Sequence, residues 1–238
     1  MYKGKTFLGI IPARGGSKGL PNKNIKLLHG KPLIEYTIHA ANYSKLLDDC
    51  VVSTDSEEIM NIAKESGGNV PFLRPDYLAT DTATTFDAVE HAINFYKDTL
   101  NKEYDYIVLL EPTSPLREDD DIDNMIMRIV ENDTKFDSIV SIGEVDEHPS
   151  ILKKIMDDDS IIPYCDNLKV TNRRQDNDVA YFPYCVAYIA KMGNFLEEKT
   201  FYTKRNTYYK IKKHQCYEID DIFNFLSIEN IMKHLKEI

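Results

Sequence analysis

Three basic side chains stand close together in a glycine-rich stretch near the start of the chain. The stretch, residues 13–24, lies between an apolar run and a segment with helical spacing. Glycines let the backbone N–H groups of such a loop approach a bound group, and clustered cations favour a polyanion such as a triphosphate. The spacing is neither that of a Walker A loop nor the dinucleotide G-x-G-x-x-G. A solvated basic turn is the alternative. The candidate side chains are Arg14, Ser17, Lys18, Lys23 and Asn24.

Two later positions could bind a nucleotide or its acceptor. Arg74 precedes a proline and a threonine-rich stretch, and its guanidinium is suited to bidentate contact with phosphate. Glu111 is the first residue after a buried strand, in a loop whose shape is fixed by Pro112 and Pro115. We therefore expect Glu111 to point into a cleft and to read a substrate. An ordinary strand-to-helix turn is the alternative for this loop.

Two carboxylates alternate with an apolar residue shortly before the last helix. Glu218 and Asp220 flank Ile219, so an extended backbone would place both acids on one side. Such a pair could hold Mg²⁺ through oxygen ligands, with triphosphate oxygens and water completing the shell. The alternative is an acidic first helical turn, favoured by the helix dipole, with Asp221 as the cap.

A pair of arginines lies in the least regular part of the chain. Arg173 and Arg174 precede Gln175 and could bind a substrate carboxylate or phosphate, or form surface ion pairs with nearby acids. A phosphate loop, arginines and a carboxylate pair, without a Ser-His-Asp order, indicate nucleotidyl transfer by positioning and metal electrostatics.

The elements that position these residues alternate between strand and helix. Such alternation is typical of an α/β fold with a largely parallel sheet covered on both faces, whose ligands lie at the carboxyl ends of the strands. The rhythm breaks between about 144 and 182, which predicts an inserted arm within a single domain spanning 1–238. Strands are expected near 6–12, 49–54, 104–110, 137–143 and 184–189, and helices near 32–44, 56–66, 82–99, 119–132 and from 222, the last with Phe225, Ile228, Met232 and Leu235 on one face.

Composition narrows the class of protein. The 238 residues carry a net charge of −10, which argues against a general nucleic-acid-binding surface. No apolar run approaches the ~18–20 residues that cross a bilayer, and no signal-peptide pattern opens the chain. The four cysteines lack C-x-x-C spacing and are expected to be reduced thiols. A cytoplasmic protein with no membrane partner is the expectation.

With these residues in view, the chain resembles the acylneuraminate cytidylyltransferases, or CMP-sialic acid synthetases, over nearly its whole length. The first of the matching motifs is long and ordered, which makes the resemblance specific. The motifs are Ile11-Pro12-Ala13-Arg14-Gly15-Gly16-Ser17-Lys18-Gly19-Leu20-Pro21-x-Lys23-Asn24, Val52-Ser53-Thr54-Asp55, Arg74-Pro75, Pro112-Thr113-Ser114-Pro115-Leu116-Arg117 and Arg174-Gln175.

The resemblance implies a Rossmann-like nucleotidyltransferase fold, a homodimer built with the inserted arm, and a reaction of CTP with a nine-carbon 2-keto sugar acid. The products would be a CMP-sugar and pyrophosphate, with Mg²⁺ as cofactor. The resemblance also implies residue roles. The residues expected to contact the nucleotide are Arg14, Ser17, Lys18, Lys23 and Asn24, with Arg74 and Thr82 on the cytidine side. The sugar would be contacted by Glu111, Arg174 and Gln175. The catalytic residues would be Lys23, Arg14 and Asp220, and the metal would be bound by Asp220 and Glu218.

The chain departs from the resembled pattern at three places. Glu111 replaces a common glutamine, Glu218 replaces a common aspartate, and Tyr184-Cys185 replaces an Asn-Gly pair. A negative Glu111 near an acidic sugar costs Coulomb energy unless it meets an amine or hydroxyls, which favours a variant acid such as a diamino-dideoxy relative of sialic acid. The alternatives are a nucleotidyltransferase for another sugar or another NTP, and a catalytically silent nucleotide-sugar-binding protein.

Overall fold

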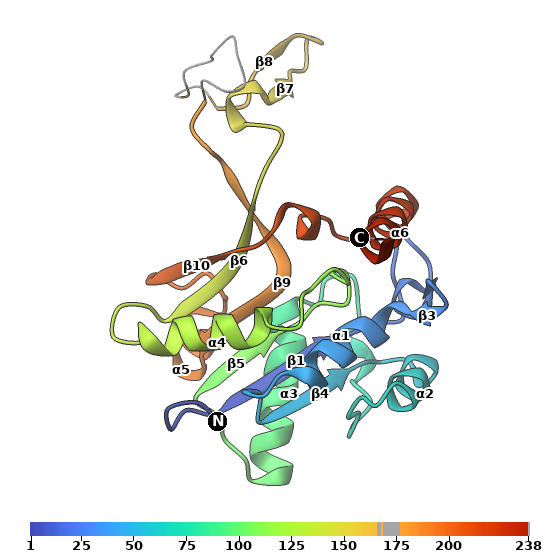
Figure 1. Ribbon diagram of the computed structural model, residues 1–238, viewed down its shortest axis with the longest axis vertical. Helices are drawn as coiled ribbons and strands as arrows, with labels where there is room; N and C mark the ends of the chain where they lie inside the picture. The colour runs from blue at the N-terminus through green and yellow to red at the C-terminus, as the bar shows by residue number, and fades with distance from the viewer. Residues whose placement is uncertain (166–167, 169–176, 238) are drawn as a thin grey trace.

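A six-stranded sheet forms the centre of the protein (Figure 1). The computed structural model describes residues 1–165, 168 and 177–237. The strand order is β10-β6-β9-β5-β1-β4, and every neighbouring pair is parallel except the two that involve β9. The expectation of a mostly parallel α/β sheet is therefore confirmed. The strands are β1 (Phe7–Pro12), β4 (Asp49–Ser53), β5 (Tyr106–Leu109), β6 (Ser138–Glu144), β9 (Tyr181–Lys191) and β10 (Asn206–Lys210).

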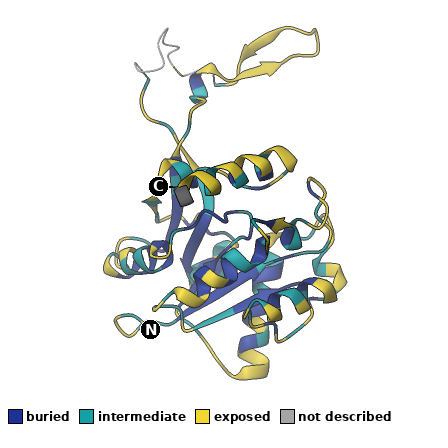
Figure 2. Ribbon diagram, turned by 45° about the vertical axis from the view of Figure 1, so that its right-hand side comes forward, coloured by how far each residue is buried: buried dark blue, intermediate teal, exposed yellow. Residues whose placement is uncertain are grey.

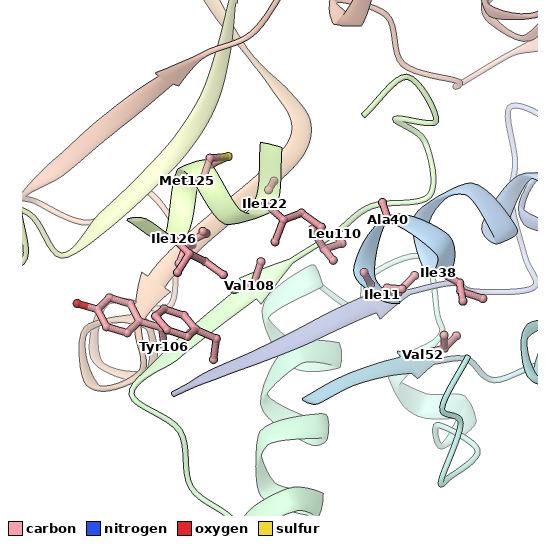
Figure 3. Close-up of a cluster of buried hydrophobic side chains, with 14 of the residues drawn as sticks. Ile11, Ile38, Ala40, Val52, Tyr106, Val108, Leu110, Ile122, Met125 and Ile126 are labelled. Carbon is pink, nitrogen blue, oxygen red and sulfur yellow. The ribbon is translucent and has the colours of Figure 1, made fainter. Parts of the chain in front are cut away.

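Helices cover both faces of this sheet because its inner strands are apolar on both sides. In β1, Phe7 and Ile11 belong to one buried cluster, and Leu8 and Ile10 to the other. The first cluster packs under α1 (Leu33–Tyr43), α2 (Glu57–Glu65) and α4 (Asp121–Glu131), as Figure 3 shows for part of it. The second packs under α3 (Thr85–Leu100) and α5 (Met192–Glu198).

Helix α3 begins later than its apolar spacing suggests. Its N-cap is Thr84, whose hydroxyl accepts the N–H of Asp87 at 3.2 Å while the Asp87 carboxylate accepts the N–H of Thr84 at 2.7 Å. This reciprocal capping box fixes the first turn. Residues 82 and 83, expected to be inside the helix, instead belong to the preceding loop.

Strand β9 differs most from the sequence expectation. It is longer than the predicted 184–189 and runs antiparallel between β5 and β6. Its register against β6 shifts between Val140 and Ile142. Strand β10 and helix α5 were not predicted, because they are short and carry little periodic signal.

A hairpin projects from the sheet along the extensions of β6 and β9 (Figure 1). It consists of β7 (Lys153–Ile155) and β8 (Ile161–Pro163), and it lies in the 144–182 segment expected to be an inserted arm. Figure 2 shows the hairpin almost wholly exposed, and large apolar side chains on it face solvent: Ile155 is 74% exposed and Ile161 65%.

The last helix, α6 (Ile222–Glu237), packs on the segment that follows β1. Phe225 and Ile228 are buried with Leu20 and Leu28, the latter in the short β2 (Leu27–Leu28), which pairs with β3 (Lys31–Pro32). Leu235, expected on the same face, is 42% exposed, because the contact surface ends before the last turn. This small third core holds the beginning of α6 against the glycine-rich loop.

The described residues bear on two expectations from the sequence, one about membrane-spanning helices and one about the cysteines. Each helix there is too short or too polar to cross a lipid bilayer. Cys50, Cys165, Cys185 and Cys216 are all free thiols.

Candidate active site

Most of the side chains singled out from the sequence surround one cavity of about 510 Å³. Thr82 lies in the adjoining loop without lining the cavity, and Glu218 does not line it either. Arg174 and Gln175 lie outside the described residues. The predicted residues that line the cavity are Arg14, Ser17, Lys18, Lys23, Asn24, Arg74, Glu111 and Asp220. The carboxyl ends of β1 and β5 supply most of them, as expected for an α/β sheet.

Lys23 is held in a fixed position at one end of this cavity. It begins a short 3₁₀ helix (Lys23–Ile25), and its ammonium donates to the Ile219 carbonyl at 2.8 Å and to the Asp220 carboxylate at 3.3 Å. Only 14% of the side chain is exposed. The neighbouring Asn24 is buried, and its amide donates to the Arg14 carbonyl at 3.0 Å. Asn24 therefore shapes the loop from within, and Lys23 presents a single immobilised cation.

Gly19 explains how the loop comes so close to the segment before α6. A Cβ atom at this position would lie 2.2 Å from the Asp220 carbonyl oxygen, which is far inside van der Waals contact. By contrast, a Cβ at Gly16 would meet nothing within 4 Å. The sequence predicted that these glycines let the loop backbone approach a bound group. At Gly19 the missing side chain instead lets the loop pack against the backbone of Asp220.

The other loop cations are paired with a carboxylate that the sequence did not single out. Asp81 lies 2.7 Å from the Lys18 ammonium and 3.6 Å from the Arg14 guanidinium. The hydrogen bond from Lys18, together with the charges of Lys18 and Arg14, holds the pKa of Asp81 below its usual range. The carboxylate thus lies where the loop would receive an anion.

Arg74 also lines the cavity and is 4% exposed. Burial lowers its pKa, while the carboxylate of Asp55, 3.5 Å away, opposes this shift. Asp55 also accepts the N–H of Gly15 at 3.0 Å, so it joins Arg74 to the glycine-rich loop. The next residue, Ser56, caps α2, because its hydroxyl accepts the N–H of Ile59. The Arg74 Nε atom is buried without a hydrogen-bond partner, so one donor remains for a ligand.

The loop after β5 is anchored by a buried guanidinium. Arg117 donates to the Val186 carbonyl at 2.5 Å, the Cys185 carbonyl at 3.3 Å, the Glu111 carbonyl at 3.2 Å and the Thr37 hydroxyl at 3.2 Å. The motif around Arg117 therefore fixes the backbone of Glu111 against β9. The Glu111 side chain lines the cavity and is hydrogen-bonded to the Cys185 thiol.

A second cavity, of about 560 Å³, adjoins the first, because Thr84, Thr85 and Glu111 line both. Aromatic side chains from α3, β9, α5 and the segment after α5 form much of its wall. They are Phe86, Tyr188, Phe195, Phe201 and Tyr202, and Lys199 is a cationic member of the lining. Phe195 and Phe201 pack with ring centroids 4.6 Å apart. Glu111 therefore stands at the junction of a cationic cavity and an aromatic one.

Comparison with known proteins agrees with this arrangement. The sequence profile of the Cytidylyltransferase family matches residues 8–236, nearly the whole chain. The chain belongs to the cytidylyltransferase family. It is 38% identical over 92% of its length to the N-acylneuraminate cytidylyltransferase of Streptococcus agalactiae serotype V, and it spans 51% of that relative. It is 34% identical to the CMP-N,N'-diacetyllegionaminic acid synthase of Legionella pneumophila, covering 83% of each chain.

A further relative and one solved structure extend the comparison. The chain is 32% identical to the pseudaminic acid cytidylyltransferase of Campylobacter jejuni, over 90% of this chain and 91% of that one. The structure of CMP:2-keto-3-deoxy-manno-octonic acid synthetase complexed with CTP superposes with a TM-score of 0.67 at 15% identity, over 97% of this chain and 99% of that one. At that identity the likeness establishes the fold. The chain spans about half the length of the N-acylneuraminate cytidylyltransferases it matches.

The two carboxylates of the acidic pair, Glu218 and Asp220, have different partners. Asp220 is 76% exposed and faces the first cavity beside Lys23. The Glu218 carboxylate instead accepts the N–H of Cys185 on β9. Burial raises the pKa of Glu218, opposed by hydrogen bonds from Cys185 and reinforced by the charges of Glu111 and Asp220.

The different partners of Glu218 and Asp220 decide which of these carboxylates fits a metal ion. Within the described ranges, no three His, Cys, Asp or Glu side chains are placed to hold a metal together. Mg²⁺ in phosphate-transfer sites is commonly bound by one or two carboxylates plus substrate phosphates. Asp220 fits that arrangement, because its exposed carboxylate lies on the cavity that the cationic loop lines. Glu218 does not fit as a direct ligand.

Sequence reasoning missed three groups of residues at this site. Asp81 is not indicated by the sequence because a lone aspartate carries no periodic signal, and Asp55 is indicated only as part of a motif, without its contact to Arg74. Arg117 was read as part of a motif without a role, because its partners lie 68–80 residues away or in the adjacent loop. The aromatic wall combines α3 with the segment after β9. Its signal in sequence is limited to the adjacent pair Phe201-Tyr202.

Proposed function

We propose that this protein transfers CMP from CTP to the anomeric hydroxyl of a nonulosonic, sialic-acid-like sugar acid and releases pyrophosphate. The observation that carries the proposal is the junction at Glu111 between a cavity lined by loop cations and a cavity lined by aromatic rings. A triphosphate requires the first kind of surface and a substituted sugar the second. The names of the relatives support this pairing, since they include N-acylneuraminate, legionaminic and pseudaminic acid enzymes.

On the nucleotide side, the loop after β1 would receive the triphosphate. Arg14 and Lys18 would exchange their contact with Asp81 for phosphate oxygens, and Ser17 would add a hydrogen bond. Lys23, held by Ile219 and Asp220, would stabilise the negative charge that develops on the leaving pyrophosphate. Its immobilisation matters because a preorganised cation needs no reorganisation during the reaction.

Arg74 would also hold the nucleotide in this cavity, where its unpartnered Nε can donate. Thr82 remains a proposed cytidine contact, reached through movement of the loop that carries Asp81. We assign Mg²⁺ to the carboxylate of Asp220. When bound there, the ion would supply charge neutralisation to the phosphates.

On the acceptor side, the aromatic wall would bury the apolar groups of the sugar. Glu111 would meet the acceptor at the junction. Arg174 and Gln175 remain proposed sugar contacts.

A homodimer is part of the proposal. The exposed apolar side chains of the β7–β8 hairpin, among them Ile155 and Ile161, are unusual on a solvent-facing hairpin. A second copy that covers them would bury this surface. The four free thiols are consistent with a reducing compartment, so we place the enzyme in the cytoplasm.

The test is pyrophosphate release by the purified protein with each of the four NTPs against a panel of nonulosonic acids. Turnover restricted to CTP and at least one such acid is expected. Lys23→Ala should fall by ~10²–10³-fold in kcat, whereas Lys31→Ala, at an exposed lysine paired with Glu35, should not change. Preference for another NTP or a sugar phosphate would favour the alternative nucleotidyltransferase. Binding of CTP without turnover of any acceptor would favour a silent binding protein.

A further inference from the structure

A carboxylate side chain lies at the junction between the two cavities. Glu111 lines both cavities, and the buried carboxylate of Glu218 lies close enough to contribute to the same field. Cys185 contacts both acids: its N–H donates to Glu218, and its thiol is hydrogen-bonded to the Glu111 carboxylate and lies 3.3 Å from the Tyr188 hydroxyl. Burial, followed by the charges of Glu111 and Glu218, raises the pKa of the Cys185 thiol. The thiol is therefore neutral and offers no charge compensation.

No cation among the described residues is seen to pair with the Glu111 carboxylate. The guanidinium of Arg117 donates its hydrogen bonds to carbonyl oxygens and to Thr37, and it acts on the Glu111 carboxylate through its charge alone. Lys199 lines the second cavity, and its ammonium lies over the ring of Phe86, 5.5 Å from the centroid. The Glu111 carboxylate thus has one hydrogen bond from a neutral thiol and the nearby charge of Arg117, and its remaining acceptor positions are open to whatever occupies the junction.

An acceptor that is itself an acid should avoid a carboxylate at this point unless the group that meets it carries positive charge or several N–H donors. The neighbouring walls favour the same chemistry, because Tyr188 and Tyr202 line the cavity and aromatic rings attract cations. A neutral acetamide would offer one N–H and a carbonyl oxygen that the carboxylate repels. A protonated amine or an amidinium would offer several donors and a full charge.

We propose that Glu111 is a specificity-determining residue that selects sugar acids bearing a basic nitrogen substituent, an amino or amidino group, over the same acids with that nitrogen acetylated. This inference rests on the proposed function and names the acceptor class within it. Glu218 supports Glu111 by accepting the N–H of Cys185, whose thiol is hydrogen-bonded to Glu111.

The experiment uses pairs of nonulosonic acids that differ at one nitrogen, free amine against acetamide, with saturating CTP. For at least one pair, wild-type kcat/KM should be about 10- to 100-fold higher for the amine, the size expected of a charge-assisted hydrogen bond. Glu111→Gln keeps the volume and removes the charge, and it should lower this preference by about tenfold or more while leaving KM for CTP unchanged. Glu197→Gln, at an exposed carboxylate of α5 outside both cavities, should keep the wild-type preference.

Equal turnover of both members of every pair by the wild type would overturn the inference, as would a preference that survives Glu111→Gln. In either case the proposed function would stand, because CTP-dependent turnover would still be observed. If the wild type released no pyrophosphate from CTP with any acid, the proposed function would fail and the inference with it. Calorimetric binding of each sugar in the presence of a non-hydrolysable CTP analogue gives a second readout, in which the amine should bind more tightly and Glu111→Gln should remove the difference.

Discussion

The buried guanidinium of Arg117 allows a quantitative prediction, because its partners can be counted. It donates to three backbone carbonyls, those of Glu111, Cys185 and Val186, and to one hydroxyl. Two of these carbonyls lie in β9, in the stretch where the register against β6 is irregular. Arg117 thus supplies hydrogen bonds that the strand ladder does not supply there.

We expect Arg117→Met to destabilise the protein by about 2–4 kcal/mol. Methionine keeps the apolar stem but leaves three buried carbonyls without their donor, at a cost of about 1–2 kcal/mol each. Removing a buried charge returns part of this cost, because the desolvation of the guanidinium is no longer required. For a domain of this size the melting temperature should fall by roughly 5–15 °C.

The measurement is urea-induced unfolding followed by circular dichroism, with the slope of the transition compared between variants. Arg128→Met, at an exposed arginine on α4 that lies over the Tyr208 ring, serves as the control and should change stability by less than about 0.5 kcal/mol. Because Arg117 also holds the Glu111 backbone, the KM for the acceptor should rise more than the KM for CTP. A loss of stability for Arg117→Met no larger than that of the control would refute this reasoning.

Three other perturbations have defined outcomes. Gly19→Ala should lower kcat by about tenfold or more, because the new Cβ would lie 2.2 Å from the Asp220 carbonyl and displace that segment. Asp81→Asn should tighten binding of inorganic triphosphate by about three- to tenfold in calorimetry, less at high salt, because an internal competitor for the loop cations is removed. Asp137→Asn should cost about 1–3 kcal/mol in urea unfolding above pH ~4, and the difference from wild type should shrink as the pH falls, because Arg205 holds the pKa of this buried carboxyl below its usual range.

Matched controls make these outcomes decisive. Gly16→Ala places its Cβ in open space and should keep wild-type kcat. Asp76→Asn removes an exposed carboxylate from the same connection as Asp81 and should leave triphosphate binding unchanged. Unaltered kcat in Gly19→Ala, unaltered triphosphate affinity in Asp81→Asn, or a stability deficit in Asp137→Asn that grows toward acid pH would each contradict the corresponding argument.

The sequence by itself determined the alternating α/β class and the cationic loop. Both follow from local patterns: the apolar run of β1 can only be buried, and α3 shows its inner face through Val89, Ile93 and Tyr96. Arg14, Lys18 and Lys23 are close in the chain, so no long-range contact is needed to bring them to one loop. The apolar strand that ends at Pro12 and the basic loop that follows it therefore predicted where the site lies.

The tertiary structure decided what depends on contacts between distant segments. The direction of β9 cannot be read from its composition, because an apolar strand is equally suited to either direction. Glu218 and Asp220 are two residues apart, yet one carboxylate meets Cys185 and the other Lys23, since each follows the partner that packing brings to it. The second cavity, likewise, exists only where α3, β9 and the segment after α5 converge on Glu111, because the sheet order, and not the chain order, sets which side chains become neighbours.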